Sequence, residues 1–182
     1  MDAWKKLICR GNRSFERGQL EDASWQYLAA LQEADRSIIW VADECAAAEG
    51  RQRNGWQSGM AAAAGQAQAG VGDASSTGNS CHYQDAVAAV AAYVVTRRNL
   101  ADLCLRLDRS DEAAEHLRSL QARLAAIIDD AGQPWTLRAA ALRNSRRAQD
   151  AVLSFVEEHG IAGPSCAYER SITHLPPSPV LH

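Results

Sequence analysis

Few residues in this sequence combine the type and the spacing that catalysis or metal binding requires. Cys81 and His82 are adjacent, but no C-x-x-C, E-x-x-H or H-x-x-x-H pattern lies near them to complete a metal or nucleophile site. The five cysteines are odd in number and widely scattered, so they indicate neither a disulfide framework nor a zinc knuckle. The sequence therefore predicts no catalytic residue, no metal site and no cofactor.

A cluster of arginines makes one stretch of the chain locally basic. A solvated helix face is the favoured interpretation of this cluster, and contact with an acidic partner or RNA is the alternative. The whole chain has a formal net charge of −3 and a pI of about 5.9, so it has no overall basic field to attract phosphates. Nucleic acid is therefore not the expected partner. The clustered arginines are Arg138, Arg143, Arg146 and Arg147.

Apolar residues recur at helical steps through most of the chain, which predicts an all-α fold of about five to six helices. The sequence leaves open whether Asn144 and Ser145 divide the last of these segments into two helices. The predicted helices cover about 3–16, 20–49, 83–107, 110–131 and 134–158.

Two segments lack this periodicity. Residues 51–80 are rich in glycine, alanine, glutamine and serine and have few large apolar side chains, so we expect a flexible loop. Residues 161–182 contain Pro176, Pro177 and Pro179, which is typical of an extended or disordered tail. We therefore expect one helical domain over 1–160, interrupted by the loop and followed by the tail.

One stretch near the N-terminus has small and aromatic residues at the spacings of a paired-helix repeat. Gly11 lies within the first predicted helix, Gly18 ends it, and Ala23, Tyr27 and Ala30 follow in the second. An interior glycine costs a helix roughly 1 kcal/mol relative to alanine, so close helix contact must offset it. The stretch closely resembles a tetratricopeptide repeat (TPR), in which such residues mark the crossing of two antiparallel helices.

A weaker copy of the pattern follows later in the chain. Ala101 stands at the position of the crossing glycine, Asp108 at that of the turn glycine, and Ala113 at that of Ala23. Ala23 and Ala113 lie 90 residues apart, whereas equivalent positions of tandem repeats lie about 34 residues apart. The resemblance therefore implies a long insertion between the two copies. A third pair over 134–158 lacks the signature and is interpreted as a cap. The structural repeat positions are Gly11, Gly18, Ala23, Tyr27, Ala30, Ala101, Ala113, Leu117 and Leu120.

The resemblance implies a module that binds a peptide or helix of another protein in a concave groove, as an adaptor or chaperone does. Some members of the family clamp a partner's C-terminal carboxylate with basic residues and asparagines. Asn12 and Asn99 stand at the asparagine positions, but Ile8 replaces the first lysine, so this clamp is not expected. The groove candidates are Lys5, Ile8, Asn12, Phe15, Glu16, Val95, Arg98, Asn99, Asp102, Leu105 and Arg106.

Other functions stay open at this point. The repeat faces could instead pair in a homodimer, and a small enzyme or nucleic-acid regulator is a less favoured alternative. Trp25 and Trp40 lie outside the main apolar stripe of their helix. One of them could therefore contact a partner or lie under the insertion. No run of about eighteen apolar residues and no export signal is found, so we expect a cytoplasmic protein without a membrane partner.

Overall fold

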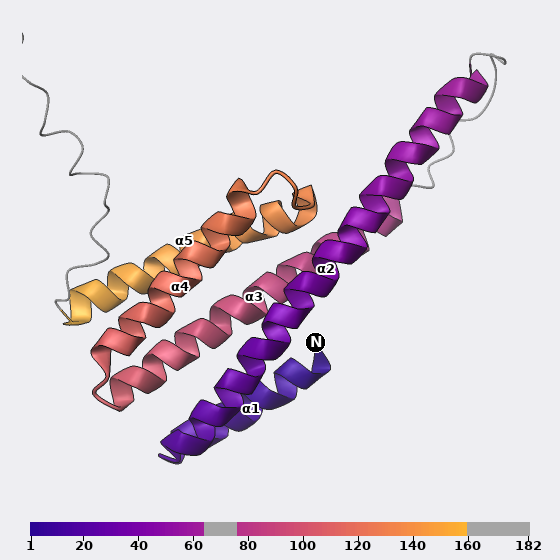
Figure 1. Ribbon diagram of the computed structural model, residues 1–182. Coiled ribbons are helices and arrows are strands. Elements are labelled where there is room, and N and C mark those ends of the chain that lie inside the picture. The colour runs from indigo at the N-terminus through magenta and orange to yellow at the C-terminus, as the bar shows by residue number, and fades with distance from the viewer. Residues whose placement is uncertain (64–75, 160–182) are drawn as a thin grey trace, which may run out of the picture.

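The protein is all-α, as the sequence predicts. A computed structural model describes the backbone of residues 1–63 and 76–159 and the side chains of residues 1–51 and 83–158 (Figure 1). Within these ranges it consists of five helices and contains no strand. The helices are α1 (Asp2–Glu16), α2 (Leu20–Ala63), α3 (Ser76–Arg106), α4 (Ser110–Asp129) and α5 (Trp135–His159).

The turn between α1 and α2 and the turn between α3 and α4 have the same geometry. Each contains one residue with positive φ, Gly18 at 74° and Asp108 at 56°. In the first turn the Gln19 amide donates to the Ser14 carbonyl over 2.9 Å, and in the second the Arg109 amide makes the equivalent 2.9 Å bond to Cys104. A left-handed residue with such a bond closes a helix C-terminus and reverses the chain. Two similar helix hairpins result.

The helices of the first hairpin cross where their side chains are smallest. A Cβ placed on Gly11 would lie 2.5 Å and 2.7 Å from the ring atoms Cε1 and Cδ1 of Tyr27, so the ring occupies the space that a side chain would need. Ala23 is fully buried beside this crossing, and Ala113 is equally buried in the second hairpin. The absence of a side chain at Gly11 thus lets the Tyr27 ring of α2 lie directly against the backbone of α1.

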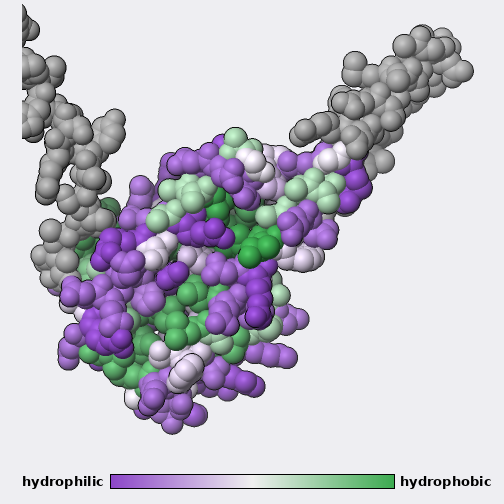
Figure 2. Space-filling model, viewed as in Figure 1, coloured by the Kyte–Doolittle hydropathy of each residue, from purple (hydrophilic) through white to green (hydrophobic). Residues whose placement is uncertain are grey.

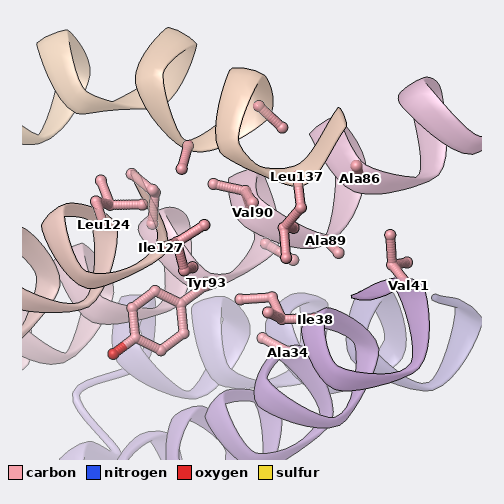
Figure 3. Close-up of a cluster of buried hydrophobic side chains, with 14 of the residues drawn as sticks. Ala34, Ile38, Val41, Ala86, Ala89, Val90, Tyr93, Leu124, Ile127 and Leu137 are labelled. Carbon is pink, nitrogen blue, oxygen red and sulfur yellow. The ribbon is translucent and has the colours of Figure 1, made fainter. Parts of the chain in front are cut away.

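The main hydrophobic core joins the two hairpins to α5. Ile38 and Val41 of α2 meet Val90 and Tyr93 of α3, and Leu137 of α5 packs into the same cluster (Figure 3). Each helix packs against the next along the chain, and α3 also contacts α5. In Figure 1, α2 crosses in front of α1 and α3, and α4 crosses in front of α5, so the helices form two layers.

The helices extend further than the sequence analysis expected. The segment 51–80 was expected to be a flexible loop, but α2 continues to Ala63 and α3 already begins at Ser76. The extension of α2 contains alanine and glutamine, which are good helix formers, and extending an existing helix does not require a new nucleus. The rest of the expected loop, 64–75, and the expected tail at 161–182 lie outside the described residues.

The segment 134–158, left open by the sequence, belongs to a single helix. Asn144 is buried in α5, and its Nδ2 donates to the Ala140 carbonyl one turn earlier over 2.9 Å. The side chain thus bonds along the helix and does not interrupt it. Among the helices of the described residues, none is long and apolar enough to cross a membrane.

Candidate functional site

One asparagine connects three helices on the layer formed by α1 and α3. The Oδ1 of Asn12 accepts a 2.8 Å hydrogen bond from the Tyr27 hydroxyl of α2 and a 3.1 Å bond from Nδ2 of Asn99 on α3. Further along the same helices, the Trp4 indole donates to the Thr96 hydroxyl over 2.8 Å. These contacts fix α1 against α3 and hold the polar atoms of Asn12 and Asn99 at the surface between them.

A cavity of about 260 Å³ opens at this asparagine pair. Glu16 and Asp102 contribute a carboxylate each from α1 and α3, and none of the described residues that line the cavity is basic. The Phe15 ring forms part of the wall, and the Arg106 guanidinium lies 5.1 Å from the centre of that ring. The cavity therefore combines hydrogen-bonding groups, negative charge and an aromatic surface. Its lining residues are Asn12, Phe15, Glu16, Tyr27, Asn99 and Asp102.

The electrostatics of the cavity agree with this arrangement. Burial raises the pKa of the Tyr27 hydroxyl, and the charges of Asp102 and Glu16 raise it further. Burial also raises the pKa of Asp102, while the Arg98 guanidinium opposes this change and Glu158 adds to it. The carboxylates of Glu16 and Asp102 thus lie near the Tyr27 hydroxyl, which donates a hydrogen bond to Asn12. The cavity is therefore better suited to a hydrogen-bond donor or a cation than to an anion.

A second cavity, of about 250 Å³, lies beside the first and shares Asp102 with it. Arg98 and Leu105 of α3 line one side, and Phe155 and Glu158 of α5 line the other. Because Asp102 lines both cavities, they are neighbours, one between α1 and α3 and the other between α3 and α5. We call this surface the α1/α3/α5 groove.

The structure brings most of the predicted groove residues together. Asn12, Phe15, Glu16, Asn99 and Asp102 line the first cavity. Of the remaining candidates, Arg98 and Leu105 line the second cavity, and Arg106 contacts Phe15.

Four of the predicted groove residues line neither cavity, and one of them, Arg106, lies over the Phe15 ring. The prediction that Ile8 lies in the groove is wrong, because Ile8 is only 7% exposed and packs in the core cluster that contains Ala23 and Tyr27. It lies one turn before Gly11 and therefore faces α2 with it. Lys5 and Val95 are exposed but line neither of the two cavities.

Sequence reasoning missed the contribution of α5 to the groove. Ser154, Phe155 and Glu158 lie near the end of α5 and complete the second cavity. The third helix pair lacks the repeat signature, so no position in it could be assigned to the groove from spacing. Tyr27 was predicted as a packing residue only, although its hydroxyl also reaches the first cavity. A signal in the sequence is the spacing of Phe155 and Glu158, which are three residues apart and therefore lie on the same side of a helix.

The other candidate residues do not form a site with the groove. Cys81 and His82 lie outside the residues whose side chains are described. Arg138 donates to the Ile128 carbonyl over 2.9 Å, which ties it to the end of α4, and Arg143 is exposed. Among the described cysteines, Cys9 is exposed and Cys45 and Cys104 are buried, and the described residues contain no group of three that would hold a metal ion.

Comparison with known proteins gives a family and no function. No curated protein and no solved structure matches the chain. A family model described as "Protein of unknown function (DUF2753)" matches residues 56–175. The match begins within α2, so it includes α3, α4 and α5 and leaves α1 outside. Because it covers well over half of the chain, the protein belongs to the DUF2753 family.

Proposed function

We propose that this protein is a TPR-like binding module that holds a peptide or helix of a client protein in the α1/α3/α5 groove. The observation that carries the proposal is the convergence of Asn12, Phe15, Asn99 and Asp102, from two different hairpins, on one open cavity. The equivalent turns at Gly18 and Asp108 support the repeat relation between the hairpins. An adaptor or a chaperone would use such a groove, in the cytoplasm if the sequence expectation holds.

The chemistry of the groove indicates what kind of client group would enter it. Asn12 and Asn99 already bond to each other, and Glu16 and Asp102 would repel a carboxylate at the same place. The groove therefore favours a client segment that presents a hydrogen-bond donor or a cationic side chain beside an apolar one. The apolar group would lie against Phe15, and the donor would reach the two carboxylates.

The substitution Asp102→Asn tests the groove with little change in shape. Asparagine keeps the size of the side chain but removes one of the two carboxylates that line the first cavity, so a cationic or donor group of the client loses an attractive partner. Combined with Phe15→Ala, the change also removes the aromatic surface. We expect the double variant to bind its client at least about tenfold more weakly, because a few central contacts dominate the binding energy of most interfaces.

The assay is affinity capture by the full-length wild-type and variant chains, with isotope-labelled mass spectrometry to compare the captured proteins. Leu142→Ala is the matched control, because Leu142 is 62% exposed on α5 and does not line the groove. The client should be depleted by the groove variant and retained by the control, and the purified client should then show the same difference in titration calorimetry. Equal capture by all three chains, at unchanged helical content, would sink the proposal.

A further inference from the structure

The side of α2 that faces away from the core carries an unusual number of exposed large hydrophobic residues. Trp25 is 68% exposed, Ile39 56% and Trp40 57%, and Leu28 is also exposed. Single exposed apolar residues are common, but exposed tryptophans are typical of interaction surfaces because they bury a large area with little loss of conformational freedom. The view of Figure 2, in which α2 lies in front, shows hydrophobic side chains between hydrophilic ones.

These residues lie on one continuous face. They follow helical steps of three and four residues, on the opposite side from the buried stripe that includes Tyr27 and Ile38. Trp25 and Trp40 are about 22 Å apart along the axis, given a rise of about 1.5 Å per residue. We call this surface the outer face of α2. Its exposed members are Glu21, Trp25, Leu28, Gln32, Arg36, Ile39, Trp40 and Asp43.

α2 carries more acidic than basic residues. From Leu20 to Ala63 it has seven carboxylates and three arginines, of which only Arg36 lies on this face. Arg36 donates to Glu33 of its own helix over 2.7 Å, so its charge is already matched. Glu21 and Asp43 stand at the two ends of the apolar stripe. The hydrophobic surface is therefore framed by negative charge.

This charge discriminates between the possible occupants. A second copy of the chain would place one acidic helix against another, and an anionic membrane surface would meet the same repulsion. A basic partner gains both the apolar contact and the charge attraction, and a lysine or arginine over a tryptophan ring adds a cation–π interaction. A straight stripe of about 22 Å fits a helix of about 15 residues or more.

We propose that the outer face of α2 is a second docking surface, which binds a basic amphipathic helix of a partner protein. It is independent of the groove, because none of its residues lines either groove cavity. The apolar side of the partner helix packs on Trp25, Leu28, Ile39 and Trp40. Its lysines or arginines meet the carboxylates at Glu21 and Asp43.

The probe is a synthetic helical peptide of about 18 residues with leucines on one side and lysines on the other. Titration into the full-length protein, followed by peptide fluorescence anisotropy, should show saturable binding that weakens at least about fivefold between about 50 mM and about 300 mM salt. Trp25→Ala combined with Trp40→Ala should weaken it at least about tenfold. Glu21→Lys with Asp43→Lys should weaken it similarly without removing any apolar surface.

Three controls define the outcome. A peptide with glutamates in place of the lysines should not bind, and Leu142→Ala with Leu153→Ala, two exposed leucines of α5, should leave binding unchanged. Light scattering should show a monomer at tens of micromolar, and vesicles of anionic lipid should not retain the protein. Absence of peptide binding, equal binding by the tryptophan variant, a dimer abolished by that variant, or vesicle binding through it would each overturn the proposal.

Discussion

Replacing Gly11 by alanine tests the close approach of α1 to α2 on which the first hairpin depends. Alanine favours a helix over glycine by about 1 kcal/mol, so at an open site this change would stabilise the protein. Here the new methyl group would lie 2.5 Å from Cε1 of Tyr27, well inside contact distance. The ring cannot easily shift, because its hydroxyl is bonded to Asn12. Overpacking of this kind costs about 1–3 kcal/mol.

The expected net effect is a loss of up to about 2 kcal/mol in the free energy of unfolding, after the propensity gain is subtracted. The second hairpin suggests a rescue, since it has Ala101 and Leu117 at the positions of Gly11 and Tyr27. On a Tyr27→Leu background, Gly11→Ala should be neutral or stabilising by up to about 1 kcal/mol. The two positions should therefore show a coupling energy of about 2 kcal/mol.

Urea unfolding of the four proteins of this cycle, followed by circular dichroism, measures the coupling directly. The m-value should stay constant across the set, which would show that the same surface unfolds in each. The reasoning fails if Gly11→Ala stabilises the wild-type protein, or if it has the same effect on both backgrounds. Either result would mean that the Tyr27 ring moves aside freely.

Further predictions concern the turns, the second crossing and one histidine. Asp108→Gly should stabilise the protein by about 0.5–1 kcal/mol, because glycine adopts a φ of 56° without strain, and Gly18→Ala should destabilise it by about 1 kcal/mol; urea unfolding checks both. Ala113→Leu should lower the stability by about 1–3 kcal/mol, since Ala113 is fully buried, and an unchanged melting temperature would contradict its placement. Burial and the neighbouring Arg97 lower the pKa of His116 below 6.5, so the unfolded chain binds the proton more readily and stability should fall as the pH drops below about 6.5. Burial is the main cause of the lowered pKa, although nearby carboxylates oppose it. The substitution His116→Gln should make the stability depend less on pH, as measured by urea unfolding between about pH 7 and about pH 5.

The sequence predicted the parts of the fold that depend on backbone geometry and side-chain size. Gly18 was expected to end the first helix because the repeat pattern has a glycine there, and Asp108 stands at the equivalent position of the weaker copy; both have positive φ. Ala23 and Ala113 were identified as crossing points because only small residues allow helices to approach closely. These signals are local, so they can be read without knowing the rest of the structure.

The errors arise where the outcome depends on neighbours that the sequence does not name. Ile8 was placed in the groove by the resemblance. It lies on the same side of α1 as Gly11, however, and therefore packs in the core. The α5 side of the groove was missed because Ser154 and Glu158 become groove residues only when α5 packs on α3. The far part of α2 was expected to be flexible because it offers few large apolar groups, a criterion that neglects helix propagation.

The two longest helices extend the molecule at the end away from the turns. α2 and α3 have 44 and 31 residues, against 20 in α4, and their far ends project beyond the other helices (Figure 1). The turns at Gly18 and Asp108 lie at the opposite end, and helical hydrogen bonds connect only residues a few positions apart. Whole turns added to or removed from this arm would therefore change its reach and leave the residues of the proposed binding groove in place.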